Sequence, residues 1–541
     1  MAIPAYAESL KTAIASAHPL ATEAGFEVLA NGGNAFDAAV AVSAALAVVE
    51  PTGSGLGGGG FWLLHRAKDN FETMIDGREK APIAATKNMY VNEQNNVIED
   101  LSKEGALSAA IPGLPAAITH LAKKYGRLPL SESLAPAIRY ATEGFAIGPH
   151  YLDLLTRRQK LIRKNKESTR ILLTDGQLPL QGALLKQPDL AHTLQQIAAK
   201  GKAGFYQGET AKKLIQAVQE KGGIWTQADL DRYQIIERMP IYGYYKDIKV
   251  TSAALPSSGG IVLVEALNIL SAYKLDTVTN IQKKHLITEA MRRAYHDRAL
   301  YLGDSDFIQV PISQLLDHNY AAGLRSNIRI DRALPSNALS GEEEIKIKGE
   351  DTTHFSIIDT EGNRISATLS INFPFGSGVI AKGTGVILNN EMDDFVSLEG
   401  QQNGYGLIGG AANTIAPEKR MLSSMTPTFL ESHDRIAVLG TPGGSRIISM
   451  ILLSVLDFSE GNSPDSWVKI PRYHHQYIPD QILYEAGGLS EAEEKGLFAL
   501  GHSLKERENT YGNMQAAELN KHKGKLKAAS DPRGEGFSDV R

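Results

Sequence analysis

A threonine pair in the middle of the chain, Thr352-Thr353, is the first feature whose residue types suggest chemistry. It follows Glu350-Asp351 and precedes the alternating polar and apolar run His354-Phe355-Ser356. If the chain is cut after Asp351, Thr352 gains a free α-amine that can act as base for its own nucleophilic hydroxyl. Such an amine has an unperturbed pKa of about 7.7–8.0, near the pH at which a general base works best. The alternative is an ordinary strand start rich in β-branched residues.

Two adjacent glycines further along could stabilise a negatively charged oxygen. The segment Thr441-Pro442-Gly443-Gly444-Ser445-Arg446 follows a strand-like run, Ile436-Ala437-Val438-Leu439. Glycines let backbone N–H groups approach a reacting carbonyl without interference from Cβ, which is what an oxyanion hole requires. A plain turn is the alternative interpretation of the same residues.

Three further segments carry groups that suit an amino-acid-like ligand. Asp76 to Pro82 contains Arg78, whose guanidinium suits carboxylate recognition, although a surface ion pair is the alternative. Ser423-Ser424 adds hydroxyl donors close to a proline, and Leu388 to Phe395 concentrates acidic and amide groups. The latter could hold an ammonium group or could be an exposed acidic loop. Together the segments predict a pocket for a zwitterion, in which the threonine attacks an acyl carbon further along the ligand.

The composition is that of a globular protein and excludes several functional classes. Hydrophobic residues make up 43% and charged residues 22% of 541 residues, so the chain can bury a large core. The net charge of 56 − 61 = −5 argues against nucleic-acid binding. Without cysteine there are no disulfides and no thiolate nucleophile or metal ligand. The 14 histidines show no metal-binding spacing, and only His474-His475 are adjacent. We expect neither a metal nor an organic cofactor.

The spacing of apolar residues predicts helices first and strands later. Residues 9–50 read as helical, and Ala38 to Val49 as a buried helix too short to span a membrane. Gly55 to Gly60 lacks the Gly-Lys-Ser/Thr ending of a phosphate loop and runs from a helix into a strand, so close backbone packing is predicted. Further helices are expected within 115–235, from Pro256-Ser257-Ser258-Gly259-Gly260 to about 272, and over 280–302. Strands are expected at 355–358 and 364–371, joined by a turn over 359–363, and at 436–440 and 481–484.

Two segments are not expected to belong to the packed core, namely residues 335–351 and the first residues of the chain. Residues 335–351 are polar and charged, which predicts an exposed linker where cleavage before Thr352 would be tolerated. Near the start, Ala5-Tyr6-Ala7 resembles the end of a leader peptide, although no complete signal peptide precedes it. This favours a periplasmic or extracellular protein and leaves a cytoplasmic one open.

These motifs together resemble the γ-glutamyltranspeptidases (glutathione hydrolases), a family of N-terminal nucleophile hydrolases. The resemblance extends from Ser16-Ala17-His18-Pro19 to Ser530-Asp531-Pro532-Arg533. Its most specific parts are Thr352 to Ser356, Asn389 to Phe395, Arg420 to Pro427 and Pro442 to Arg446. Gly32 to Ala39, Asp76 to Pro82 and Pro256 to Gly260 support it.

The resemblance implies an α+β fold, a four-layer αββα sandwich, and autocleavage into a mostly helical large subunit, 1–351, and a small subunit, 352–541. The two would remain one structural unit, a heterodimer. The implied site roles are as follows: Thr352 as nucleophile; Ser370, where Thr is common, as the hydroxyl that bonds to it; Gly443 and Gly444 as oxyanion donors; Asn372, Glu391 and Asp394 as α-amino contacts; and Arg78, Ser423 and Ser424 as α-carboxylate contacts.

Leu398 to Arg420 is similar to the lid loop of lid-bearing family members, with Tyr405 at the place of an aromatic gate. The sequence therefore predicts a γ-glutamyl hydrolase and transferase that acts on glutathione-like compounds and passes the acyl group to water, an amino acid or a peptide. The alternatives are an acylase or poly-γ-glutamate enzyme of the same fold, and an unprocessed, non-catalytic binding protein. The intact Thr352, Gly443 and Gly444 argue against the last of these.

Overall fold

Two antiparallel sheets form the centre of the molecule in the computed structural model, which describes residues 11–339 and 352–541. The first sheet has the strand order β20-β1-β9-β10-β2-β3-β6. Its strands are β20 (Phe537–Val540), β1 (Ala13–Ser16), β9 (Thr353–Ile358), β10 (Arg364–Ser370), β2 (Gly59–Arg66), β3 (Phe71–Gly77) and β6 (Ile236–Arg238). The second sheet has the order β19-β18-β14-β13-β8-β7. Its strands are β19 (Lys525–Ser530), β18 (Gln515–Asn520), β14 (Arg435–Gly440), β13 (Thr428–Glu431), β8 (Ile248–Ser252) and β7 (Ile241–Tyr245).

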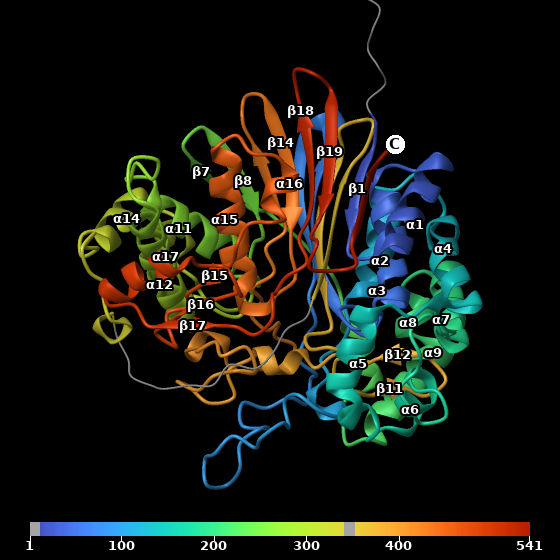
Figure 1. The fold of residues 1–541 in the computed structure, drawn as a ribbon. Helices are drawn as coiled ribbons and strands as arrows, with labels where there is room; N and C mark the ends of the chain where they lie inside the picture. Colours follow the sequence, from blue (N-terminus) through green and yellow to red (C-terminus); the bar gives the residue numbers. More distant parts are fainter. Residues whose placement is uncertain (1–10, 340–351) are drawn as a thin grey trace, which may run out of the picture.

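Helices cover the outer face of each sheet, so that the layers follow the order αββα (Figure 1). One helical layer lies beside the first sheet and consists of α1 (Pro19–Ala30), α2 (Ala35–Val49), α3 (Leu114–Lys124), α4 (Leu130–Glu143), α5 (Pro149–Ile162), α6 (Lys166–Leu172), α7 (Pro188–Lys200), α8 (Ala203–Tyr206), α9 (Gly208–Gln219) and α10 (Gln227–Arg232). The other covers the second sheet with α11 (Gly259–Leu270), α12 (Asn280–Tyr301), α13 (Ile312–Leu315), α14 (His318–Arg325), α15 (Ile447–Ser459), α16 (Pro464–Trp467) and α17 (Glu491–Ala499).

The apolar core is split by the first sheet, whose strands bury side chains on both faces. Alternate residues of β2 belong to different apolar clusters. Trp62 and Leu64 pack with α2 and the helices around it, whereas Phe61 and Leu63 pack between the sheets. This alternation follows from the two-residue period of a strand. Helix α2 is buried along its whole length, as its largely apolar sequence predicts, and the two polar residues Asp37 and Ser43 are buried with it.

In each sheet, strands from before Thr352 pair with strands from after it. In the first, β9 and β10 lie between β1 and β2; in the second, β13 pairs with β8. The hairpin predicted at 359–363 joins β9 to β10, and the Asp359 carboxylate accepts backbone N–H groups of Glu361 and Asn363 within it. A break before Thr352 would therefore leave both sheets hydrogen-bonded across the two pieces.

The glycine run after α2 serves close backbone packing, as its sequence predicts. A Cβ on Gly57 would lie 1.9 Å from the carbonyl oxygen of Ile387, and one on Gly58 would lie 2.1 Å from that of Ser370. A side chain on Gly58 would push the end of strand β10 away, and one on Gly57 would displace the backbone at Ile387. The glycines thus set the position of the end of β10, where Ser370 lies.

One expectation about local structure was wrong, and a second, that of an exposed linker, fails at Ser336, whereas Pro335, Asn337 and Ala338 are exposed. Residues 13–16, expected to be helical, form strand β1, because a run as short as Ala-Ile-Ala-Ser fits either state and pairing with β9 and β20 decides between them. The start of the expected linker, Pro335-Ser336-Asn337, is ordered, with a 3₁₀ turn over Ser336–Ala338. Ser336 is buried because its hydroxyl donates to the Tyr477 carbonyl and its N–H to Asp480.

The remaining predicted elements are present with bounds close to those expected: α11, α12, β9, β10, β14 and β16 (Ile482–Tyr484). Residues 340–351 of the expected linker, including Glu350-Asp351, and the leader-like Ala5-Tyr6-Ala7 lie outside the described residues. Among the helices that the structure describes, none has the length and apolar character needed to cross a membrane.

Candidate active site

Thr352 immediately precedes β9 in the first sheet and is buried, with 3% of its surface exposed. Strands β9 and β10 are paired so that Thr353 faces Leu369. Continuing this antiparallel register by one residue places Ser370, at the end of β10, opposite Thr352. The Ser370 Oγ also accepts the N–H of Asn372, 2.8 Å away, which fixes its position. The sheet thus brings together two hydroxyl residues that are 18 positions apart in the sequence.

The glycine pair lies between β14 and α15 and has backbone angles that only glycine adopts readily. Gly443 has φ of +141° and Gly444 of +59°. A Cβ on Gly444 would lie 2.3 Å from the ring of Tyr405, and one on Gly443 would lie 2.6 Å from Met450. The pair begins the short helix Gly444–Arg446 that leads into α15, and the start of a helix favours negative charge. This backbone suits oxyanion stabilisation.

Arg78 lies at the end of the first sheet, just after β3, and is almost fully buried in a cluster of carboxylates. Its Nη1 lies 2.6 Å from Glu391 Oε2 and its Nη2 lies 2.5 Å from Asp394 Oδ2. Glu79, also buried, lies 3.5 Å from Nη1. The sequence predicts that Arg78 and the acidic residues hold opposite ends of a ligand. In the structure they pair with one another instead.

Arg298 is a binding-site candidate that sequence reasoning missed. It lies on α12, and its guanidinium donates to Ser258 Oγ at 2.9 Å and to Ser424 Oγ at 3.2 Å. Only 5% of the residue is exposed, and within the described part of the chain it makes no ion pair. No sequence signal distinguished it from the other arginines of α12, because its burial depends on how α12 packs.

Burial and neighbouring charges shift the acid–base properties of this cluster. Burial, reinforced by the adjacent Glu391, raises the pKa of Asp394 to about 7, even though Arg78 opposes the shift. Burial also raises the pKa of Glu79 well above its ordinary value. Burial lowers the pKa of Arg298 to about 10, because no strong counter-charge offsets it. The pocket therefore holds a buried guanidinium that makes no ion pair within the described ranges, together with Asp394, whose pKa lies near neutral pH.

The segment predicted to be a lid lies beside these groups, and its residues Tyr405 and Leu407 line the same pocket. Tyr405 is 4% exposed, its hydroxyl donates to the Asn372 carbonyl at 2.8 Å, and its ring packs on Phe373 with centroids 5.0 Å apart. Gln476 donates to the carbonyl of Gly406 at 2.8 Å. These bonds tie the lid segment to residues at the end of β10 and after β15 (Tyr473–His474).

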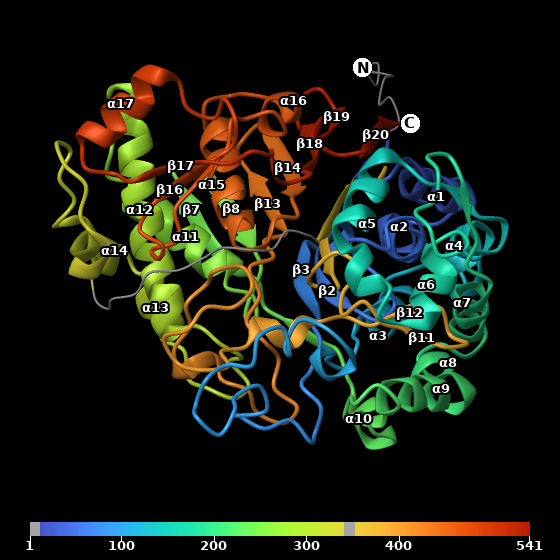
Figure 2. The same cartoon turned by 60° about the horizontal axis from the view of Figure 1, so that its bottom comes forward.

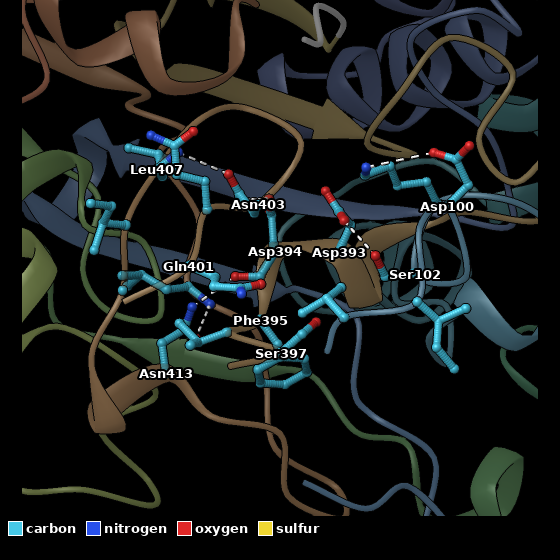
Figure 3. A pocket seen from close by; sticks show the side chains of 18 of the residues that line it. Asp100, Ser102, Asp393, Asp394, Phe395, Ser397, Gln401, Asn403, Leu407 and Asn413 are labelled. Atoms are coloured by element: carbon cyan, nitrogen blue, oxygen red, sulfur yellow. Dashed lines mark hydrogen bonds and ion pairs between the residues drawn. The ribbon is translucent and has the colours of Figure 1, made fainter. Parts of the chain in front are cut away.

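A small cavity separates the lid from a segment of the N-terminal part of the chain. Figures 2 and 3 show residues near 100 lying against residues 393–413, with the side chains of Asp100, Ser102, Asp393 and Asn403 around the space. Ser102 donates to Asp393 Oδ1 at 2.6 Å, and Asp393 Oδ2 accepts the N–H of Gly404 at 2.8 Å. Arg298 and Asp394 also line this space, which therefore adjoins the charged cluster.

A single pocket contains nearly all of the predicted site residues. The residues that line it are Arg78, Thr352, Ser370, Asn372, Glu391, Asp394, Tyr405, Ser423, Ser424 and Gly444, together with Arg298. Gly443 instead lines a neighbouring cavity that also reaches Thr352. Asn372 has φ of +75° and donates its amide N–H to the Asn390 carbonyl, and the Ser423 Oγ accepts the N–H of Met425. Residues distributed over 367 positions thus meet in one place.

His474 and His475 have no part in this pocket. His474 bonds to Ser449 Oγ and Gln476 Oε1, and His475 to Asp480. Within the described ranges, His285, Glu289 and His502 form a cluster with metal-like composition. Glu289 pairs with Arg292 and Arg293, and His285 Nδ1 and His502 Nε2 lie 2.8 Å apart in a hydrogen bond. Most of these groups thus have protein partners, whereas the buried Nδ1 of His502 has no hydrogen-bond partner among the described residues.

A threonine beside a predicted cleavage point, at the start of a central strand in an αββα sandwich, defines the N-terminal nucleophile hydrolase class, to which this enzyme belongs. A family profile described as γ-glutamyltranspeptidase matches residues 21–540. The chain belongs to the γ-glutamyltranspeptidase family. It is 44% identical over 501 residues to the glutathione hydrolase proenzyme of Pseudomonas sp. (strain A14), with 91% of this chain and 86% of the relative covered. It is 38% identical to the glutathione hydrolase proenzyme of Escherichia coli (strain K12), with 96% and 90% covered.

Solved structures agree with the fold. A cephalosporin acylase from Bacillus halodurans superposes with a TM-score of 0.87 at 27% identity, covering 100% of this chain and 98% of its own. Helicobacter pylori γ-glutamyltranspeptidase gives a TM-score of 0.58 at 40% identity, covering 59% of this chain and 92% of its own. The expected αββα sandwich and the family resemblance are thereby confirmed.

Proposed function

We propose that this enzyme hydrolyses and transfers the γ-glutamyl group of glutathione and related compounds through an acyl-Thr352 intermediate. The observation that carries the proposal is the composition of one pocket. It contains Thr352, the guanidinium of Arg298, which makes no ion pair among the described residues, and the carboxylates of Glu391 and Asp394. A γ-glutamyl group carries an α-carboxylate and an α-ammonium at the end remote from its acyl carbon. The two kinds of charge in the pocket match those two groups.

Each step of the reaction can be assigned to a residue of the chain. In maturation, Thr352 Oγ attacks the Asp351 carbonyl and water releases the acyl group, which frees the Thr352 α-amine. In turnover, that amine takes the proton from Oγ as Oγ attacks the γ-carbonyl carbon. The N–H groups of Gly443 and Gly444 stabilise the oxyanion, and Ser370 orients the Thr352 hydroxyl. The amine returns the proton to the leaving nitrogen, and water or an acceptor amine then releases the acyl group.

The ligand's α-carboxylate would lie between Arg298, Ser423 and Ser424, and its ammonium against Glu391, Asp394 and Asn372. Arg78 would keep the carboxylates in place and complete the carboxylate site. Tyr405 would cover the bound ligand. Because strands from both sides of Thr352 interleave, the fragments 1–351 and 352–541 would remain associated as a heterodimer.

The decisive experiment is the intact mass of the purified, denatured protein. Two fragments, the smaller beginning at Thr352, are expected, together with release of anilide from a γ-glutamyl anilide. A single uncut chain would contradict the nucleophile assignment and favour a binding protein. For localisation we propose export, on the basis of Ala5-Tyr6-Ala7; cell fractionation tests it, and a purely cytoplasmic protein would refute it.

An acylase is the second candidate, supported by 35% identity to the acylase ACY 1 proenzyme of Pseudomonas sp. (strain V22) over 93% of this chain. A glutaryl anilide, which lacks the α-ammonium, distinguishes the two. A γ-glutamyl enzyme should favour the γ-glutamyl anilide strongly, because Glu391 and Asp394 lose their partner with the glutaryl donor. Equal rates would favour an acylase. The lid over the pocket argues against a poly-γ-glutamate enzyme, whose long substrate needs an open groove.

A further inference from the structure

The side chain of Gln476 connects the lid to the glycine pair that precedes α15. It is buried, with 5% of its surface exposed. Its Nε2 donates to the Gly406 carbonyl of the lid at 2.8 Å, and its Oε1 accepts the Ser445 hydroxyl at 2.7 Å. Ser445 directly follows Gly444 in the short helix that leads into α15. One amide group therefore bonds both to the lid and to the turn assigned to oxyanion stabilisation.

The direction of these hydrogen bonds follows from which groups can donate. A carbonyl oxygen only accepts, so the NH₂ of Gln476 must face Gly406 and its Oε1 must face away from the lid. There Oε1 also contacts His474 Nε2 at 2.8 Å, which must therefore carry the ring proton, while His474 Nδ1 accepts the Ser449 hydroxyl at 2.6 Å. Burial lowers the pKa of His474 to about 3, so the neutral ring has this single N–H. His474 and Ser449 thus fix how the Gln476 amide is turned.

The lid turn that Gln476 holds also carries the Tyr405 ring. Asn403 Oδ1 accepts the N–H of Tyr405 at 3.0 Å, and the Asn403 carbonyl accepts that of Gly406 at 2.9 Å. These bonds hold the three residues in one turn, so the Gly406 carbonyl and the Tyr405 ring move together. The ring packs directly on Gly444, where a Cβ would lie 2.3 Å from it. A shift of the lid away from Gln476 therefore also removes the ring from the glycine pair.

We propose that Gln476 is a positioning residue that couples closure of the lid to the position of the glycine pair, and that His474 orients its amide. The proposal rests on the proposed function, in which Tyr405 covers the γ-glutamyl group and the glycine pair stabilises the oxyanion. When Gln476 holds both, the lid closes over backbone N–H groups that are already placed for the transition state. Without this link, the lid opens more often and the glycine pair is held less firmly.

The direct test is Gln476→Glu in the processed enzyme. The carboxylate keeps an acceptor for Ser445 and His474 but places a second acceptor against the Gly406 carbonyl, so the bond to the lid is lost. Hydrogen–deuterium exchange of lid residues 403–407 should become about tenfold faster, because a buried carbonyl loses its donor. With a γ-glutamyl anilide, kcat should fall about tenfold while KM changes less than about twofold, since the charged pocket that binds the donor is intact.

Two further variants separate coupling from a general loss of structure. Gln187→Glu is the matched control: Gln187 is 4% exposed and its Nε2 donates to the Val48 carbonyl at 2.9 Å, but it does not line the pocket. Lid exchange and kcat should stay at the parent values in this control. Ser445→Ala removes only a hydroxyl that donates to Gln476 and leaves the lid itself unchanged. Lid exchange should still become about threefold faster, and this rise should be absent when Gln476→Glu is already present.

The outcomes separate this proposal from the proposed function. Faster lid exchange with an unchanged kcat would make Gln476 an anchor of the lid alone and would overturn the coupling. A lower kcat with unchanged lid exchange, or equal effects in Gln187→Glu, would overturn it as well. A parent enzyme that releases no anilide would refute the proposed function, whereas lid exchange reports on the coupling independently of turnover.

Discussion

Replacing Arg298 with methionine should separate catalysis from stability. Arg298 donates to Ser258 and Ser424 and has no ion-pair partner among the described residues, and burial lowers its pKa from 12.5 to about 10. At 1.36 kcal/mol per pKa unit, holding this charge in the folded protein costs roughly 3 kcal/mol. Methionine fills a similar volume without a charge, so the variant should be no less stable than the parent enzyme, and thermal unfolding measures this.

In contrast to its stability, the activity of the Arg298→Met variant should fall. Losing one partner of a buried, hydrogen-bonded charge pair costs about 2–5 kcal/mol; at roughly 2–3 kcal/mol, kcat/KM for a γ-glutamyl anilide falls about 30- to 150-fold. With 4-aminobutyryl anilide, which lacks the α-carboxylate, the parent and the variant should differ little. The reasoning is refuted if the penalty is the same with both donors, or if the variant unfolds at a clearly lower temperature.

Three further substitutions test neighbouring parts of the site. Arg78→Ala should raise KM for γ-glutamyl donors strongly and, unlike Arg298→Met, should also destabilise the fold by about 3–5 kcal/mol, because Glu391 and Asp394 lose their counter-charge; an unchanged KM would remove Arg78 from the ligand site. Thr352→Ala should abolish both processing and turnover, as seen by intact mass and anilide release, and retained processing would contradict self-cleavage. Since the ionised form of Asp394 attracts the ammonium and its pKa is raised to about 7, inhibition by L-glutamate should weaken as the pH falls through 7. L-Glutamate should inhibit the Asp394→Asn variant weakly, and this inhibition should not change as the pH falls through 7. A pH-dependent change of the same size in the variant would assign the titration to another group.

Much of the architecture follows from local sequence. The apolar period predicts α2, α11 and α12, and the turn residues at 359–363 predict the hairpin of β9 and β10, because these signals depend on neighbours a few residues apart. Strand β1 was missed because four residues carry too little periodicity, and its state depends on pairing with strands more than 300 residues away.

The sequence by itself determined which residue types are available for the chemistry: a threonine after a predicted cut, a glycine pair, and separate basic, hydroxyl and acidic segments. It also excluded cysteine chemistry. Only the tertiary structure decided how the charges pair. It turns Arg78 towards Glu391 and Asp394 and brings the inconspicuous Arg298 of α12 to Ser424, because the burial and partners of a charged side chain depend on packing between distant elements. It also showed that Thr352 lies between two cavities, a property of the space between side chains that no segment of the sequence encodes.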